Sequence, residues 1–263
     1  MKKILTFAFL ALFAGQIFAK QAIQVVGVEP SKQPEYVKVN IVLPKKGSMQ
    51  KNFVWIQTRV RGFALGAISQ LPRRNEISTS SDVQSLHVVV DDMPYFVFDG
   101  LSLDPLEDQG DYDEALYKFK IPFRLSEGLH VLRIFPCRSF GEGLNKERNF
   151  ASTYFYIGKK KGSASFLKDP FITYNEPTGV IKEKGTKPLL LDFYVHNCEL
   201  SKDGYKVQLY IDDVLRKELF EETPYYIYGL RKGHHKIRLR LVDKDNELVK
   251  GPFNDVLRTI KIE

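Results

Sequence analysis

Cysteine is almost absent from the 263-residue sequence, in which only Cys137 and Cys198 occur. Two cysteines cannot form the dense disulfide framework of small secreted domains. If a domain boundary lies between them, each domain holds one cysteine, and a disulfide within either domain is excluded. A bridge between the domains and two unpaired thiols both stay open, because sequence separation does not show whether two side chains meet.

Long hydrophobic runs are also absent, apart from one near the start. The run Ile4–Gly15 follows two lysines and ends shortly before Lys20. It is shorter than the ~20 apolar residues that a membrane-spanning helix needs. This arrangement is typical of a secretory signal peptide, which we assign to residues 1–19. We therefore expect a mature protein that is periplasmic or extracellular and has no transmembrane helix.

Common catalytic and binding motifs are missing as well. The sequence has no Gly-rich phosphate loop, no zinc-ligand spacing and no nucleophile elbow. Its net charge of +7 is spread along the chain rather than gathered in one tract. Such a surplus favours peripheral association with anionic envelope surfaces and is a poor indication of nucleic-acid binding. We expect no cofactor, no metal ion and no catalytic residue.

The chain contains two related halves. Three segments occur twice: GLHVLRIFP and GHHKIRLRL from Gly128 and Gly233, HVVVDDMPYF and QLYIDDVLRK from His87 and Gln208, and VEP and NEP from Val28 and Asn175. The matching apolar positions preserve which face of a strand is buried. We infer two copies of one domain, residues 20–158 and 163–263, joined by a polar linker at 159–162.

Each copy consists of short extended segments separated by turn residues. In the second copy, Ile237, Leu239 and Leu241 alternate with basic residues, the period of two expected of a strand with one buried face. We expect strands near 171–174, 188–196, 205–212, 214–220, 224–228, 234–242 and 255–262. The predicted fold is all-β, with two tandem immunoglobulin-like β-sandwich domains after the signal peptide.

The repeated Leu-x-x-Gly-x-His segment resembles the corner before the penultimate strand of bacterial immunoglobulin-like and fibronectin type III-like domains. The resemblance implies a left-handed backbone at Gly128 and Gly233, where a Cβ atom is costly. It also implies that His130 and His235 hydrogen-bond back to the corner, which favours a structural role over that of a base or metal ligand. LRIFPCRSFGEGLNKERNFASTYF is also similar to secreted bacterial proteins with an Arg-x-Phe-Pro-x-Arg segment, without indicating an activity.

The first copy carries extra residues between Leu43 and Leu86, including KNFVWIQTRVRGFALGAISQLPRR and the only tryptophan. On a strand, Trp55, Arg59 and Arg61 would share one face. There an indole can stack on a sugar ring, and guanidinium groups can pair with carboxylate or phosphate. This face is our candidate for a ligand-binding surface, although a structural role is the favoured interpretation. In that structural interpretation, the sheet is enlarged and Trp55 covers the edge of the core.

A second difference between the copies is the loop from Arg138 to Lys146, which includes Glu142. Because function tends to lie on variable loops, we add Arg138, Glu142 and Lys146 to the candidate ligand-binding residues. The first copy also has an acidic segment, DPLEDQGDYDE from Asp104 to Glu114. It is either a solvated charge run or a calcium-binding loop, although its spacing is not that of the twelve-residue calcium loop.

Three functions fit these features. We prefer a secreted, non-catalytic binding or adhesion module that recognises an envelope protein or glycan. The alternative is a periplasmic two-domain chaperone or assembly factor, although the paired basic anchor residues of pilus-type chaperones cannot be placed here. A hydrolase ranks third, because it needs convergent acid, base or nucleophile groups in one cleft, which single histidines on strands do not indicate.

Overall fold

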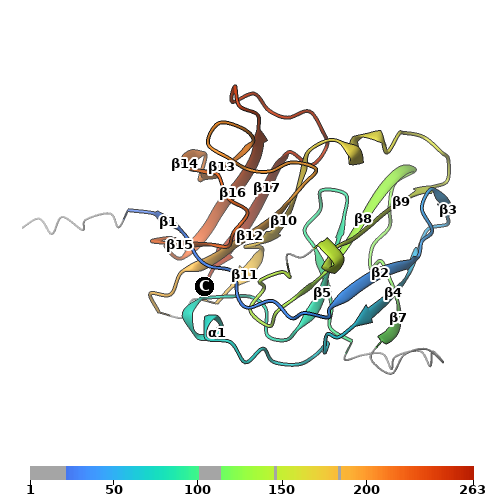
Figure 1. Cartoon of the computed structure of the whole chain (residues 1–263), viewed down its shortest axis with the longest axis horizontal. Coiled ribbons are helices and arrows are strands. Elements are labelled where there is room, and N and C mark those ends of the chain that lie inside the picture. Colours follow the sequence, from blue (N-terminus) through green and yellow to red (C-terminus); the bar gives the residue numbers. More distant parts are fainter. Residues whose placement is uncertain (1–21, 101–113, 145–146, 183–184) are drawn as a thin grey trace, which may run out of the picture.

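The computed structural model describes residues 22–100, 114–144, 147–182 and 185–263. Strands dominate this part of the chain, as Figure 1 shows. The helical elements among the described residues are short: α1 (Arg73–Glu76), η1 (Glu147–Asn149) and η2 (Ser165–Lys168). The expected all-β fold is confirmed. The signal peptide predicted at 1–19 lies outside the described residues.

The first sandwich packs a three-stranded sheet against a five-stranded sheet. The first sheet has the order β2-β4-β7, with β2 (Lys38–Leu43), β4 (Trp55–Arg61) and β7 (Glu114–Lys120). The second has the order β3-β9-β8-β5-β6, with β3 (Ser48–Gln50), β9 (Ala151–Ile157), β8 (Gly128–Cys137), β5 (Ser85–Val90) and β6 (Phe96–Phe98). Alternating apolar residues fill the space between the sheets, among them Ile56, Leu132 and Phe155.

The second sandwich repeats this plan. One sheet has the order β1-β15-β12-β10, with β1 (Gln24–Gly27), β15 (Tyr225–Tyr228), β12 (Leu189–His196) and β10 (Phe171–Glu176). The other has the order β11-β17-β16-β13-β14, with β11 (Gly179–Ile181), β17 (Asp255–Ile262), β16 (Gly233–Val242), β13 (Lys206–Ile211) and β14 (Val214–Leu219). Strands β2 to β9 correspond in order and pairing to β10 to β17. The chain is therefore a duplicated immunoglobulin-like sandwich.

The strand order corrects two points of the sequence comparison. VEP and NEP are not equivalent, because the segment that matches Glu176–Pro177 is Leu43–Pro44, which ends the first strand of its own sandwich. The strand with Trp55 is also not an insertion, because β4 matches β12. The additional residues of the first copy are instead 62–84, against 197–205 in the second. Strand β11 was missed, being only three residues long.

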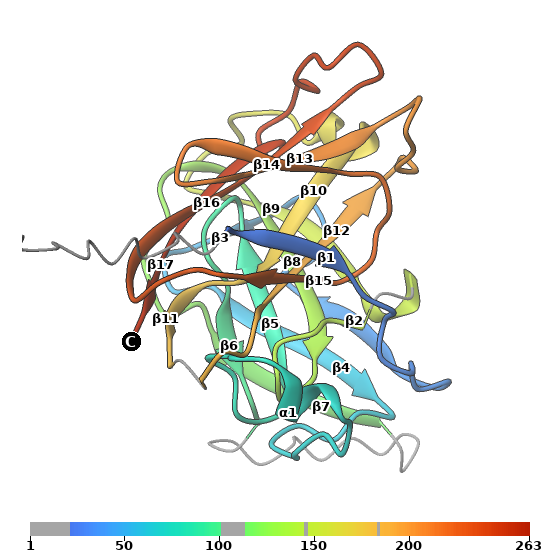
Figure 2. The ribbon, with the colours of Figure 1, turned by 90° about the vertical axis from the view of Figure 1, so that its left-hand side faces the viewer.

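The first described strand belongs to the second sandwich. β1 pairs antiparallel with β15, with Val25 opposite Ile227 and Val26 opposite Tyr226. The sequence predicts that residues 20–158 form the first domain, whereas β1 belongs to a sheet of the second sandwich. The other domain boundaries and the linker at 159–162 stay predictions. In Figure 2, β1 lies beside β15 at the edge of its sheet.

The two sandwiches pack face to face. Every residue of β5 and of β10 is buried, as expected of strands covered on both faces. One cluster between the sandwiches joins Val89, Phe135 and Cys137 to Tyr194, and another joins Val131 to Phe171 and Phe253. The sheets thus form four layers, with β5 and β8 against β10 and β12 in the middle (Figure 1). The outer sheet of the first sandwich, β2-β4-β7, carries exposed residues on its outer face, among them Trp55, Arg61 and Lys118.

Candidate functional site

The outer face of β2-β4-β7 collects basic side chains, and we call it the cationic face. Along β4, Ile56, Thr58 and Val60 are buried, while the residues between them point outward. Arg61 lies opposite Lys38 on β2 and Glu114 on β7. The cationic face comprises Lys38, Trp55, Arg59, Arg61, Lys118 and Lys120, with Gln57, Asn40 and Leu116 between them. Strand alternation and register therefore bring these residues together.

Trp55 lies among lysines. Its side chain is half-exposed, with a relative exposure of 42%. The ammonium of Lys118 is 4.7 Å from the ring centroid, and that of Lys120 is 4.4 Å away. These are cation–π contacts. Two ammonium groups beside the indole suit an anionic group better than a neutral ring.

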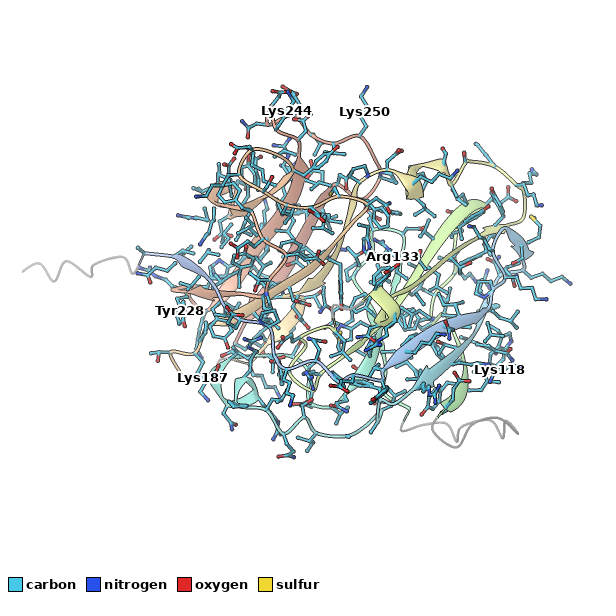
Figure 3. The ribbon with its side chains drawn as sticks, viewed as in Figure 1. Lys118, Arg133, Lys187, Tyr228, Lys244 and Lys250 are labelled. Carbon is cyan, nitrogen blue, oxygen red and sulfur yellow. The ribbon has the colours of Figure 1, made fainter. Side chains whose placement is uncertain are left out.

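The arginines of the cationic face are placed by the same strand. Arg59 forms an ion pair with Glu114 at 3.2 Å between Nη1 and Oε2. Glu114 is the acidic side chain that strand register brings to this face, and it offsets one of the cations. Figure 3 shows Lys118 projecting from the outer side of the first sandwich, far from the packing between the sandwiches. In this position the Lys118 side chain is exposed to solvent.

Arg138 and Glu142 do not belong to this surface, which corrects the sequence prediction. Glu142 is only 1% exposed and accepts hydrogen bonds from Arg73 Nη1 at 2.6 Å and from Ser31 N at 2.7 Å. The Arg138 guanidinium donates to the carbonyl of Lys32. The loop that contains Arg138 and Glu142 hydrogen-bonds to residues 28–35, so these two side chains have a structural role. Lys146 lies outside the described residues.

The repeated corner has the same geometry in both sandwiches. Gly128 and Gly233 have φ of 121° and 126°, in the region that favours glycine. His130 contacts Asp91 Oδ2 at 2.7 Å through Nδ1 and the Ser126 carbonyl at 2.9 Å through Nε2. In the second sandwich, His235 makes the same two contacts, to Asp212 at 2.7 Å and to the Arg231 carbonyl at 2.9 Å. Both ring nitrogens are engaged within the corner.

A polar centre that the sequence did not lead us to expect lies between the sandwiches. Asn175 is fully buried and contacts His87 Nδ1 at 2.6 Å through Oδ1. Its Nδ2 donates to Asp192 Oδ2 at 2.6 Å, which also accepts from Gly143 N at 3.1 Å. Burial raises the pKa of Asp192 to about 7. A single carboxylate in the apolar run LLLDFYVH was the signal for this centre, because buried charged groups need partners.

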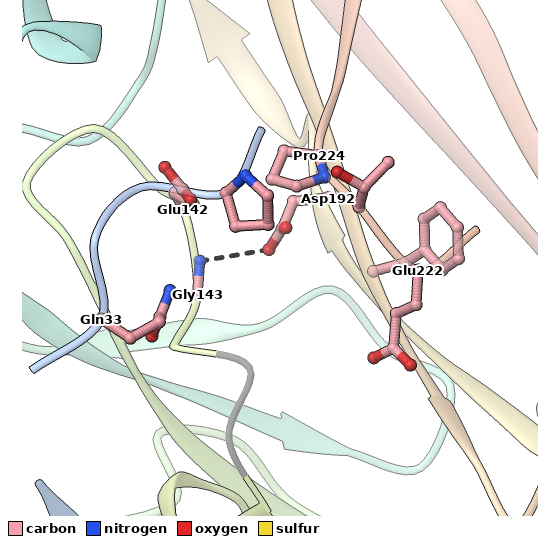
Figure 4. A pocket seen from close by; sticks show the side chains of 9 residues that line it. Gln33, Glu142, Gly143, Asp192, Glu222 and Pro224 are labelled. Atoms are coloured by element: carbon pink, nitrogen blue, oxygen red, sulfur yellow. Dashed lines mark hydrogen bonds between the residues drawn. The ribbon is translucent and has the colours of Figure 1, made fainter. Parts of the chain in front are cut away.

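A small pocket opens beside this centre, lined by carboxylates (Figure 4). Glu142, Asp192 and Glu222 contribute to its wall, together with Gln33 and Pro224. Its volume is about 10 Å³, enough for a water molecule and too small for a sugar or a peptide. The polar centre therefore binds the two sandwiches to each other, and the cationic face is the better candidate for contact with another molecule.

The structure also bears on the state of the two cysteines, on metal binding and on membrane-spanning helices. Both thiols are free: Cys137 is buried and Cys198 is half-buried. Among the described residues, no group of His, Cys, Asp and Glu has the arrangement of a metal site. The acidic segment considered for calcium lies outside those residues except for Glu114. Within the same part of the chain, no helix is long and apolar enough to cross a membrane.

No protein family model and no curated protein matches this chain. Fibronectin(III)-like modules of Clostridium thermocellum CbhA are 13% identical, with 86% of this chain and 94% of theirs covered and a TM-score of 0.29. The Ig1-2 module of Drosophila receptor protein tyrosine phosphatase DLAR is 10% identical, with 86% of this chain and 99% of the module covered and a TM-score of 0.24. Bacteroides ovatus SGBP-B, solved in complex with a mixed-linkage heptasaccharide, is 10% identical, with 92% of this chain and 47% of SGBP-B covered and a TM-score of 0.18. These likenesses carry no conclusion about ligand or activity.

Proposed function

We propose that this protein is a non-catalytic binding or adhesion module of the cell envelope, exported to the periplasm or the cell surface, that recognises an anionic partner through its cationic face. The observation that supports the proposal is the gathering of Lys38, Arg59, Arg61, Lys118 and Lys120 on one exposed sheet face. Guanidinium groups pair with carboxylates in a bidentate way, and ammonium groups add charge. A sheet holds them at fixed spacing, which lowers the entropy cost of binding.

The exposed sheet of the second sandwich offers a useful contrast. There Arg238 and Arg240 share Asp255, at 2.5 Å and 3.8 Å, and Lys236 pairs with Asp213 at 3.1 Å. These cations are largely neutralised by their neighbours. On the cationic face, Lys118 and Lys120 are exposed and lie over the Trp55 ring. This difference between the copies supports placing anion recognition in the first sandwich.

A binding experiment tests this function. The protein lacking residues 1–19 is titrated with polygalacturonate, a carboxylate polymer, and with neutral dextran. We expect binding to polygalacturonate that weakens as salt is raised, because exposed charges are screened over ~10 Å at 0.1 M. Arg61→Glu and Lys118→Glu should each weaken it severalfold. Lys250→Glu, on a distant exposed loop of the second sandwich (Figure 3), is the matched control.

The outcomes separate clearly. Equal loss of binding in Lys250→Glu and Lys118→Glu would mean that net charge rather than this face is responsible. Equal affinity for dextran would contradict recognition of an anion. Trp55→Ala should also weaken binding, because Lys118 and Lys120 are held over the indole and lose their fixed position without it. Circular dichroism of each variant establishes that the sandwich is still folded.

A further inference from the structure

The duplication lets one sandwich serve as a template for the other. β7 and β15 occupy the same place: each lies beside the central strand of its three-stranded arrangement, β4 or β12. On the far edge of β15 lies β1, an antiparallel strand whose residues from Gln24 to Gly27 pair with Tyr228 to Tyr225. The fold therefore demonstrates, within this chain, that an extended segment can add to this edge of the sandwich.

The corresponding edge of β7 is open in the described part of the chain. There β7 pairs with β4 along its whole length, from Glu114 to Lys120, and no described strand pairs with its other edge. Backbone N–H and C=O groups along such an edge are a template for another strand. Lys118 and Lys120 are exposed on β7 itself, and lysines on an edge strand discourage pairing with a neutral or basic chain.

Charge identifies the kind of segment that fits. Lys118 and Lys120 lie on this edge strand, so an incoming strand with alternate acidic side chains would place carboxylates beside them. A second copy of this chain is a poor occupant, because its net charge is +7 and the donor segment QVVG carries no acid. We propose that the free edge of β7 binds an extended acidic segment of a partner protein as an additional antiparallel strand.

This inference rests on the proposed function and makes it more specific, because main-chain hydrogen bonds then add to charge. The pairing of β1 with β15 shows how long such an added strand can be. β1 is four residues long, and Lys217 of β14, in the other sheet of the sandwich, donates from Nζ to the Val25 carbonyl at 2.8 Å. A segment of similar length on β7 would have lysines available on the strand it joins.

The test uses a synthetic ten-residue peptide of alternating glutamate and threonine and the protein lacking residues 1–19. A second peptide carries N-methyl groups on alternate residues, which keep the charge and block strand pairing along one edge. A third, with the N-methyl groups on the other alternate residues, blocks the opposite edge. Affinity is measured by calorimetry, and amide hydrogen exchange is followed at residues 114–120. We expect at least one methylated peptide to bind ~10-fold more weakly than the parent and the parent to protect β7 amides.

Equal affinity of all three peptides, without protection of β7, overturns strand addition while leaving charge-based binding intact. Binding of polygalacturonate but of none of the peptides does the same. Failure of every anionic probe removes the proposed function and this inference together. A variant with the acidic residues of 104–113 changed to Asn or Gln tests whether the chain's own acidic segment competes for this edge. If only this variant shows methylation-sensitive binding, the chain's own acidic segment is the occupant, and a partner protein is not.

Discussion

Arg133 of the first sandwich donates a hydrogen bond from Nη1 to Oγ1 of Thr173 in the second, at 2.9 Å. The same nitrogen lies 3.3 Å from the Ile172 carbonyl, and the guanidinium lies 4.2 Å from the ring of Phe253. Its counterpart in the repeat, Arg238, is on the outer sheet and pairs with Asp255. One repeated arginine has therefore become an anchor between the sandwiches, and the other a surface ion pair.

This difference predicts unequal effects of the same substitution. Arg133→Ala leaves buried neutral acceptors without their donor, which typically costs ~1–3 kcal/mol of unfolding free energy for each unsatisfied group. Arg238→Ala removes an exposed pair and should cost less than ~1 kcal/mol. Urea unfolding of the two variants measures both values. Similar losses would contradict the role of Arg133 as an anchor.

Much of the second sandwich could be predicted because alternation is clear where one sheet face is wet. Strand β16, with Ile237 and Leu239 inward and Lys236 and Arg238 outward, is an example. The first sandwich was harder, because β5 and β8 are buried on both faces and lose the alternation. The four-residue β1 leaves too little pattern to indicate which sheet it joins.

The candidate site was partly predictable for a related reason. Trp55, Arg59 and Arg61 could be placed on one face from spacing alone. Lys118 and Lys120 come from β7, and only strand register brings them beside Trp55. Arg138 and Glu142 looked like variable loop residues in sequence. Their burial depends on residues 28–35, which cross over from the second sandwich, and no local pattern reveals such a contact.

The corner glycine in the second sandwich gives a second prediction. Gly233 has φ of 126°, and a Cβ atom there would meet nothing within 4 Å. The cost of Gly233→Val is therefore conformational rather than steric, and we expect ~1–3 kcal/mol of destabilisation. Thr259→Val, on an exposed position of the paired strand β17, is the control and should change stability by less than ~0.5 kcal/mol. Thermal unfolding of both variants checks the difference.

The polar centre predicts a dependence of stability on pH. Burial raises the pKa of Glu176 to about 8 and that of Asp192 to about 7. Because ordinary carboxyl groups titrate near ~4, the folded state binds more protons than the unfolded state between pH ~4 and 8, and stability falls as pH rises. Burial lowers the pKa of His87 to about 4, which has the opposite effect only up to pH ~6.5.

We therefore expect the unfolding midpoint in urea to fall between pH 6.5 and about 8.5, where only the first effect operates. Glu176→Gln keeps an acceptor for the Tyr95 hydroxyl, which lies 2.5 Å from Glu176 Oε1, and removes that carboxylate. The decline should be shallower in this variant. Glu247→Gln, in an exposed turn, should leave the slope unchanged. An identical slope in all three proteins would show that Glu176 does not titrate in this range.

The docking of β1 is tested by two neighbouring residues that face opposite ways. Val25 packs against the core of the second sandwich, whereas Val26 is 45% exposed. Val25→Asp places a charge against that core and should cost ~2–3 kcal/mol of unfolding free energy, while Val26→Asp should stay within ~0.5 kcal/mol. Only the first should speed amide exchange in β15, whose edge β1 covers. Equal effects of the two substitutions would contradict the register in which β1 joins this sheet, and with it the template for strand addition at β7.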